Sequence, residues 1–180
     1  MRMDLCQEMI LAGFGGQGIM FAGRLIASAG MIAEKEVSWL PSYGPEMRGG
    51  TANCHVIVSD QPVGSPIVVA PTTLVAMNRP SLDKFEDAVL SDGLLIMDSS
   101  LIDRKIKRKD IKVIKIPATR MAADMGAGKL ANMIMVGQWI KETGLLSMEI
   151  VKMSLEKVVS ANKQDLMDIN IKALELGYQY

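Results

Sequence analysis

The sequence predicts an α/β fold: a Rossmann-like open, mostly parallel sheet with helices on both faces, forming one domain over residues 1–180. Several short apolar runs hardly alternate with polar residues, as in strands that are buried on both faces. Segments with apolar residues three and four positions apart, typical of amphipathic helices, separate many of these runs. A glycine-rich turn joins the first apolar run to the first helical segment.

The first strand is predicted at residues 8–12 and the first helix at residues 19–33. Between them stands Gly-Phe-Gly-Gly-Gln-Gly, residues 13–18, which matches the dinucleotide-binding fingerprint Gly-x-Gly-x-x-Gly. A strand, a glycine turn and a helix together present backbone N–H groups and a positive helix end to an anion. The first segment is therefore a candidate phosphate or nucleotide site.

The next part of the chain contains three predicted strands without a helix between them, at residues 37–40, 51–59 and 74–77. Residues 41–50 contain two prolines and three glycines, which excludes regular structure there. Part of the sheet is therefore expected to be antiparallel or linked by a hairpin.

The second half of the chain returns to strands and helices. Strands are predicted at residues 93–97 and 111–116, and helices at residues 81–89, 121–125, 129–141, 147–159 and 164–176. Ser81, Thr119 and Ser147 are suited to cap three of these helices. The helix at 129–141 is apolar on almost all sides, so we expect it to be buried.

Composition narrows the class of protein. Twenty Lys and Arg residues balance twenty Asp and Glu residues, so no global field favours nucleic acid or an acidic membrane. Cys6 and Cys54 are far apart and form no Cys-x-x-Cys motif, which argues against a disulfide framework or a metal site built by this chain alone. The N-terminus does not resemble a signal peptide, and no apolar run approaches the ~20 residues that cross a bilayer. We expect a cytoplasmic protein without a membrane segment.

The dinucleotide fingerprint lacks its usual acidic partner. In nicotinamide-binding folds an Asp or Glu at the end of the second strand holds the ribose. Here that strand ends in Trp39-Leu40-Pro41, and Glu34 and Glu36 precede it. A conventional NAD site is therefore disfavoured, while a ligand role and a tight strand-to-helix crossing that needs small residues both stay open. Gln17 favours a ligand or partner role, because its amide offers donors and acceptors.

A second loop, Ser-Tyr-Gly-Pro-Glu-Met-Arg-Gly-Gly-Thr at residues 42–51, is dense in functional groups. Arg48 offers a planar set of donors for a carboxylate or phosphate, and the glycines after it permit close backbone approach. Glu46 can instead pair with Arg48 in a rigid surface loop. If the second strand runs parallel to the first, this loop and the glycine turn lie at the same edge of the sheet, where ligands collect.

Together these two loops resemble the gamma subunit of 2-oxoacid:ferredoxin oxidoreductases. The resemblance continues through Cys54-His55-Val56-Ile57-Val58-Ser59-Asp60, the Gly64-Ser65-Pro66 turn and the late Asn132-Met133-Ile134-Met135-Val136-Gly137. It thus covers nearly the whole chain, and its Tyr-Gly-Pro-Glu-Met-Arg-Gly-Gly segment is specific.

The resemblance implies a subunit of a multi-subunit enzyme that oxidatively decarboxylates a 2-oxoacid to an acyl-coenzyme A and reduces ferredoxin. Thiamine diphosphate, Mg²⁺ and iron–sulfur clusters would lie on partner alpha, beta and, where present, delta subunits. This chain would hold no cofactor alone, would be inactive in isolation and would be prone to self-association. 2-Oxoglutarate is the favoured substrate, with pyruvate and branched-chain oxoacids open. The alternatives are an indolepyruvate oxidoreductase beta-type subunit and, less favoured, an independent NAD-binding dehydrogenase.

No catalytic residue and no metal ligand is assigned to this chain. The residues expected to contact coenzyme A or a partner subunit lie in the two loops and at the start of the buried helix. They are Gly13, Gly15, Gly16, Gln17, Gly18, Ser42, Tyr43, Glu46, Arg48, Gly49, Thr51 and Asn132. Asn132 is included because a polar amide on so apolar a helix needs a partner if it is buried.

Three other features allow two interpretations each. The basic run from Arg104 to Lys115 is either a solvated face or a docking site for an acidic partner or for coenzyme A phosphates. His55 is favoured as a buried structural residue. Asp98 follows a predicted strand and is either functional or a helix cap.

Overall fold

The computed structural model describes residues 6–42, 52–159 and 164–180. Its strands are β1 (Cys6–Gly13), β2 (Glu36–Ser42), β3 (Ala52–Ser59), β4 (Thr73–Ala76), β5 (Leu94–Asp98) and β6 (Lys112–Ile116). Its helices are α1 (Ile19–Ile32), α2 (Arg79–Phe85), α3 (Ala118–Asp124), α4 (Ala131–Thr143), α5 (Met148–Val158) and α6 (Gln164–Gln179), with a short 3₁₀ turn η2 (Glu86–Ala88) after α2.

The six strands form one mixed, mostly parallel sheet in the order β2-β3-β1-β4-β5-β6. β1, β4, β5 and β6 pair in parallel, whereas β3 is antiparallel to both of its neighbours. The predicted α/β fold is confirmed, and so is the expectation of an antiparallel part within residues 37–77. Because β2 and β1 both oppose β3, they run in the same direction and end at the same edge.

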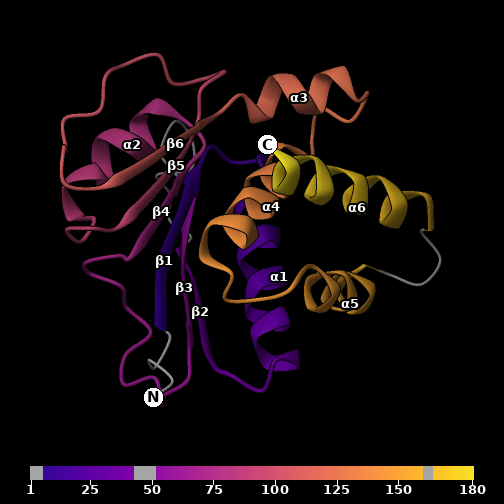
Figure 1. Ribbon diagram of the computed structural model, residues 1–180, viewed down its shortest axis with the longest axis horizontal. Helices are drawn as coiled ribbons and strands as arrows, with labels where there is room; N and C mark the ends of the chain where they lie inside the picture. The colour runs from indigo at the N-terminus through magenta and orange to yellow at the C-terminus, as the bar shows by residue number, and fades with distance from the viewer. Residues whose placement is uncertain (1–5, 43–51, 160–163) are drawn as a thin grey trace.

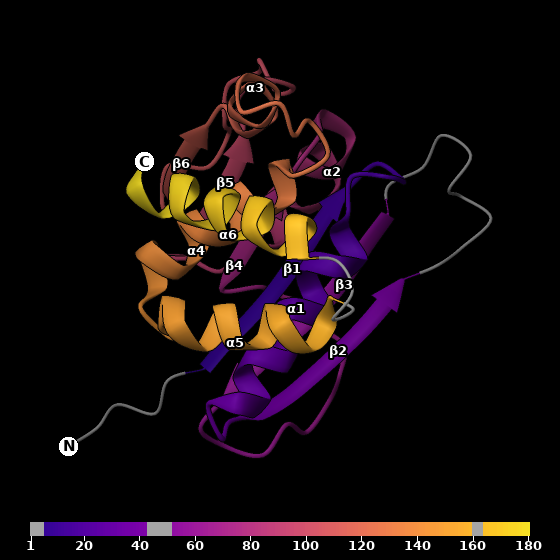
Figure 2. The same cartoon turned by 90° about the vertical axis from the view of Figure 1, so that its right-hand side faces the viewer.

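Helices cover both faces of the sheet, but unequally (Figure 1). One face, here the first face, packs against α1, α3, α4, α5 and α6 in a large apolar cluster that includes Leu25, Val56 and Trp139. Figure 2, turned toward this layer, shows α5 and α6 in front of the sheet. The second face is covered by α2 and by irregular segments, with Leu82 and Val68 in a smaller cluster.

The buried helix α4 packs closely against α6. All residues from Ala131 to Ile140 are buried, as the apolar run predicted. Gly137 and Gly177 make the close approach possible, because a Cβ at Gly137 would collide with backbone atoms of Leu174, and one at Gly177 with backbone atoms of Ile134. The backbones of the two helices thus approach closely at these two glycines, as in other packings that place small residues at a helix crossing.

The helix caps were predicted only in part. Ser147 caps α5 as expected and accepts a hydrogen bond from the Ile150 N–H at 3.3 Å. The prediction of Ser81 as a cap is wrong: α2 begins earlier, and Asn78 caps it by accepting from the Ser81 N–H at 2.8 Å. Thr119 lies inside α3, whose N-cap position is Pro117.

Candidate functional site

The glycine turn lies at the carboxyl edge of the sheet, where β1 ends at Gly13 and α1 begins at Ile19. Gly16 and Gly18 have φ angles of 89° and 75°, in the left-handed region that favours glycine. Gly13 is constrained differently, because a Cβ there would lie 2.6 Å from Gln17 Oε1. Backbone conformation therefore favours glycine at positions 16 and 18, and the folded-over Gln17 side chain favours it at position 13, whatever the turn binds.

Gln17 folds its side chain back across the turn. Its Oε1 accepts a hydrogen bond from the Phe14 backbone N–H at 2.6 Å, and its Nε2 donates to the Met77 carbonyl at 3.3 Å. The Gln17 N–H also donates to the Phe14 carbonyl at 3.2 Å. The amide that the sequence suggested for a ligand or partner is therefore bonded at both ends within the chain.

Asn132 is the second residue of α4, and its side chain joins this helix to Gly18, the N-cap residue of α1. Its side chain is 4% exposed, and its Nδ2 donates to the Gly18 carbonyl at 3.1 Å. A Cβ at Gly18 would collide with this amide, so glycine and asparagine fit together across 114 residues of sequence. The prediction that a buried Asn132 needs a partner is confirmed, although its Oδ1 has no hydrogen-bond partner among the residues that the structure describes.

The second loop is anchored at the same edge as the glycine turn. The chain leaves β2 at the exposed Ser42, which pairs in register with Asn53, and re-enters the sheet at Ala52, which pairs with Gly13. The second strand thus runs in the same direction as the first, which is the condition under which this loop and the glycine turn were expected to share an edge. The other predicted residues of this loop lie outside the described residues: Tyr43, Glu46, Arg48, Gly49 and Thr51.

Two hollows flank the glycine turn, and both include Gly18 and Phe21. One, of about 300 Å³, lies on the β3 side and is lined by Phe14, Gly15 and Gly16 of the turn and by Ala52. The other, of about 450 Å³, lies between α1, α4, α5 and α6 and is lined mainly by apolar side chains; its members are Gly18, Phe21, Lys129, Leu130, Asn132, Val158, Val159, Leu166 and Asn170. The apolar members were not predicted from the sequence, because they come from four helices and their ends and carry no distinguishing local pattern.

The acidic residues that a nicotinamide site would need are at the wrong end of the sheet. Glu36 begins β2, and Glu34 precedes it with a φ of 56°.

Asp98, at the carboxyl end of β5, is fully buried and binds the chain itself: its Oδ2 accepts from the Thr119 N–H at 3.1 Å and from the Thr119 hydroxyl at 2.5 Å. Of the two interpretations of Asp98, these contacts match the helix cap.

Part of the basic run, Arg104 to Lys115, binds an acidic side chain of the same chain. The buried Glu86 carboxylate binds Arg104 at 2.5 Å and accepts hydrogen bonds from the backbone N–H groups of Lys107 and Arg108. Burial alone would raise the pKa of Glu86, but the hydrogen bonds from Arg104 and the two amides outweigh burial and lower it. This contact ties the irregular β5–β6 connection to η2. Several lysines of the run stay exposed, Lys105, Lys107, Lys109, Lys112 and Lys115.

The single histidine and the buried cysteine have structural environments. His55 Nδ1 accepts a hydrogen bond from the Val68 N–H at 2.9 Å, and burial lowers the pKa of the imidazole. The side chain therefore holds the segment after β3 against the second face, in agreement with the structural interpretation. Burial raises the pKa of Cys54 to about 12, so this thiol stays protonated and is unreactive at neutral pH.

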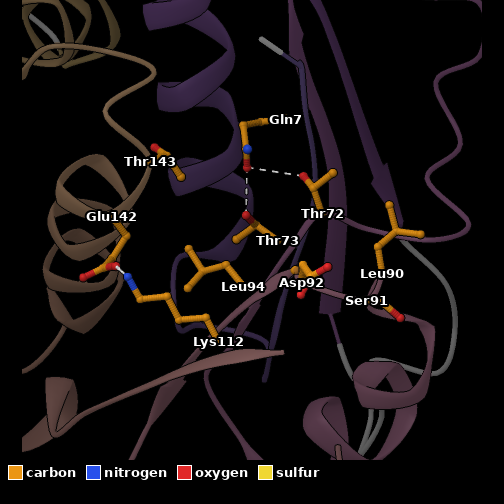
Figure 3. A pocket seen from close by; sticks show the side chains of 11 residues that line it. Gln7, Thr72, Thr73, Leu90, Ser91, Asp92, Leu94, Lys112, Glu142 and Thr143 are labelled. Carbon is orange, nitrogen blue, oxygen red and sulfur yellow. Dashed lines mark hydrogen bonds and ion pairs between the residues drawn. The ribbon is translucent and has the colours of Figure 1, made fainter. Parts of the chain in front are cut away.

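A further hollow, of about 350 Å³, lies at the opposite edge, by the amino ends of β4, β5 and β6 (Figure 3). Gln7 Oε1 accepts hydrogen bonds from the hydroxyls of Thr72 and Thr73, at 3.3 and 2.8 Å, and Lys112 pairs with Glu142 at 2.5 Å. These polar groups form hydrogen bonds and an ion pair with one another at the hollow. The glycine-turn edge therefore remains the better candidate site.

Within residues 6–42, 52–159 and 164–180, the structure contains no group of three or more His, Cys, Asp or Glu side chains placed to hold a metal ion. None of the helices in that part of the chain is long and apolar enough to cross a membrane. The described donor set therefore does not fit an iron–sulfur cluster, whose usual ligands are several cysteines.

The fold and the site define an α/β protein with a glycine turn of dinucleotide-binding form, in which the described residues at the end of β2 include no acidic partner for a nicotinamide site. A family model for pyruvate ferredoxin/flavodoxin oxidoreductase matches residues 8–180. The chain therefore belongs to this family, as the resemblance of the two loops predicted.

Individual relatives differ in how much of their length the chain spans. It is 38% identical to the ketoisovalerate oxidoreductase subunit VorA of Methanothermobacter marburgensis, over 93% of the chain but only 35% of that protein. It is 33% identical to the 2-oxoglutarate synthase subunit KorC of Methanocaldococcus jannaschii, covering 99% of the chain and 95% of KorC. The crystal structure of a keto/oxoacid ferredoxin oxidoreductase gamma subunit from Geobacter sulfurreducens superposes with a TM-score of 0.83, at 27% identity and 96% coverage of both chains.

Proposed function

We propose that the chain is the gamma subunit of a 2-oxoacid:ferredoxin oxidoreductase and acts only within that complex. The observation that carries the proposal is the end-to-end likeness to subunits of similar length, KorC and the Geobacter gamma subunit. The site geometry agrees, because the polar side chains at the glycine turn, Gln17 and Asn132, bind other parts of the chain rather than forming a catalytic set.

The favoured substrate of the complex is 2-oxoglutarate. KorC, named as a 2-oxoglutarate synthase subunit, matches this chain over nearly its full length, whereas the ketoisovalerate subunit VorA is a protein of which the chain spans about a third. Pyruvate and branched-chain oxoacids are the competing substrates. Thiamine diphosphate, Mg²⁺ and the iron–sulfur clusters would be held by alpha, beta and delta partners, which would also meet ferredoxin.

This chain would contribute one wall of the coenzyme A region. The hollow beside the glycine turn is bordered by the exposed Gly15 and Gly16 and by Ala52, the residue at which the chain re-enters the sheet after the second loop. Backbone N–H groups at the start of a helix are suited to a phosphate. Arg48 would add a bidentate donor from the loop.

The substrate assignment is tested by purifying the intact complex from its native source through a tag on this chain. Reduction of a low-potential dye is measured with 2-oxoglutarate, pyruvate, 2-ketoisovalerate and indolepyruvate, each with coenzyme A. Highest activity with 2-oxoglutarate supports the proposal. Preference for another oxoacid would change the substrate, and a tagged chain that co-purifies with no thiamine-dependent activity would refute the subunit role.

The coenzyme A contact is tested separately with Arg48→Ala in the reconstituted complex. We expect KM for coenzyme A to rise by about tenfold, the value of one charge-assisted hydrogen bond, while KM for the oxoacid stays the same. Arg24→Ala, which removes an exposed arginine from α1, is the matched control. An unchanged KM for coenzyme A in an assembled Arg48→Ala complex would remove Arg48 from the site.

A further inference from the structure

The glycine turn borders the point in the sheet where nucleotide ligands are usually bound. In open α/β sheets this point lies between adjacent parallel strands whose following segments pass to opposite faces. Here β1 and β4 are parallel neighbours, and their following helices separate: α1 packs in the cluster on the first face and α2 in the cluster on the second face. The crevice between the ends of β1 and β4 is therefore the position of a nucleotide diphosphate in such a fold.

Gln17 bridges this crevice. From the turn after β1, its Nε2 reaches the carbonyl of Met77, the residue directly after β4. Met77 is itself fixed, because its N–H donates to the Ala12 carbonyl of β1 at 2.9 Å. On the other side of the amide, Oε1 accepts from the Phe14 N–H, the kind of bond that a phosphate oxygen accepts from a glycine turn.

We propose that Gln17 is a specificity-determining residue whose carboxamide occupies the β1–β4 crevice and closes the glycine turn to dinucleotides. A diphosphate in this crevice would have to displace both hydrogen bonds of the amide and then compete for the Phe14 N–H. The amide also packs directly over the end of β1, since Gln17 Oε1 lies 2.6 Å from the position that a Cβ on Gly13 would take. The turn is thus ordered by its own side chain and needs no nucleotide.

The closure also changes the direction in which the turn can bind. With the Phe14 N–H bonded to Gln17, the exposed part of the turn is Gly15 and Gly16, which line the hollow toward Ala52 and the β2–β3 connection. The side of the turn that faces β4 is occupied by Gln17, whereas on the side that faces β3 the described residues leave Gly15 and Gly16 exposed. This inference holds for the isolated chain and does not depend on which oxoacid the complex uses.

The test follows the backbone amide of Phe14 by NMR hydrogen exchange in the full-length protein, with and without millimolar inorganic pyrophosphate or NAD. In the wild type we expect neither compound to alter Phe14 exchange. In Gln17→Ala we expect Phe14 exchange to become roughly tenfold faster, as for the loss of one hydrogen bond, and pyrophosphate to slow it again. Gln61→Ala, a change at an exposed glutamine outside the turn, should behave as the wild type.

Three results would overturn the proposal. The first is a pyrophosphate or NAD effect on Phe14 in the wild type, which needs no variant and so does not depend on how well Gln17→Ala folds. The second is a folded Gln17→Ala protein in which Phe14 exchanges at the wild-type rate. The third is a Gln17→Ala protein whose Phe14 exchange pyrophosphate leaves unchanged.

Discussion

Replacing Asn132 by Asp tests the contact that joins α4 to the glycine turn. The side chain is 4% exposed and its Nδ2 donates to the Gly18 carbonyl at 3.1 Å. Aspartate has nearly the same shape, but its ionised form carries acceptors only and would face the carbonyl without a donor. A protonated Asp can keep the hydrogen bond, so the variant should tolerate acid better than neutral pH.

The size of the effect follows from burial. Desolvation of so buried a carboxyl raises its pKa by about 2–3 units. Each unit corresponds to about 1.4 kcal/mol, and the unfolded carboxyl is already about half ionised at pH 4, so the free energy of unfolding should be lower by about 2–3 kcal/mol at neutral pH than near pH 4. The sign is set by proton uptake: the folded state, with the higher pKa, binds the proton more tightly, so stability falls as pH rises above about 4 and levels off above the folded-state pKa.

The assay is urea unfolding of Asn132→Asp and wild type between about pH 4 and pH 8, compared at each pH to remove the dependence that both proteins share. Gln61→Glu introduces the same charge at an exposed position and serves as the control. The difference between Asn132→Asp and wild type should grow with pH, while that of the control stays flat. A constant difference across this range would refute the idea that the Asn132 amide is sealed in a desolvated contact with Gly18.

Three further predictions concern packing, charge and thiol reactivity. Gly137→Ala should lower the free energy of unfolding by about 1–3 kcal/mol, despite the better helix propensity of Ala, because its Cβ meets the α6 backbone; chemical denaturation measures this, and an unchanged or higher stability would contradict the close packing. Glu86→Gln should lower the free energy of unfolding by about 3 kcal/mol at pH 7 and by less near pH 3. The reason is that the lowered pKa of Glu86 gives the wild type a stabilisation that is lost as the pH falls through that pKa. An equal loss of stability at both pH values would show that the charge is not involved. A thiol reagent should modify the exposed Cys6 in the native protein and the buried Cys54 only on unfolding, and rapid reaction of both thiols would exclude the described burial.

The sequence predicted the elements whose signals are local. The apolar run of α4, the Ser147 cap and the strand–turn–helix around Gly13 could be read from neighbouring residues, and each is present in the structure. The three predicted strands without an intervening helix, within residues 37–77, correctly indicated that part of the sheet is antiparallel. Misplacement of the α2 cap at Ser81 has a simple cause: Asn78 is an equally good cap type three residues earlier, and Pro80 fits the first turn of a helix.

Other features of the site depend on distant residues and left no local signal. Gln17 donates its hydrogen bond to the Met77 carbonyl, 60 positions away. The sequence therefore showed an amide at the turn but not the group that it binds. Similarly, Arg104 looked like part of a solvated basic face because its partner Glu86 lies in another element. Asn132 is the exception, since a polar amide on an apolar helix already implies a partner, although not that the partner is Gly18.

The hydrogen bond between Asn132 and Gly18 makes the final structure of the glycine turn depend on a distant part of the chain. The carbonyl and the amide are 114 residues apart, and the central β1 can pair with both neighbours only after β3 and β4 have formed. Bringing together groups so far apart in sequence costs conformational entropy, which the packing of α4 against the rest of the chain must offset. The contact with Asn132 exists only once α4 is in place, so without α4 the hydrogen bonds of Gln17 alone would hold the glycine turn. A partner that contacted both Gly18 and α4 would therefore recognise the packed chain rather than the turn by itself.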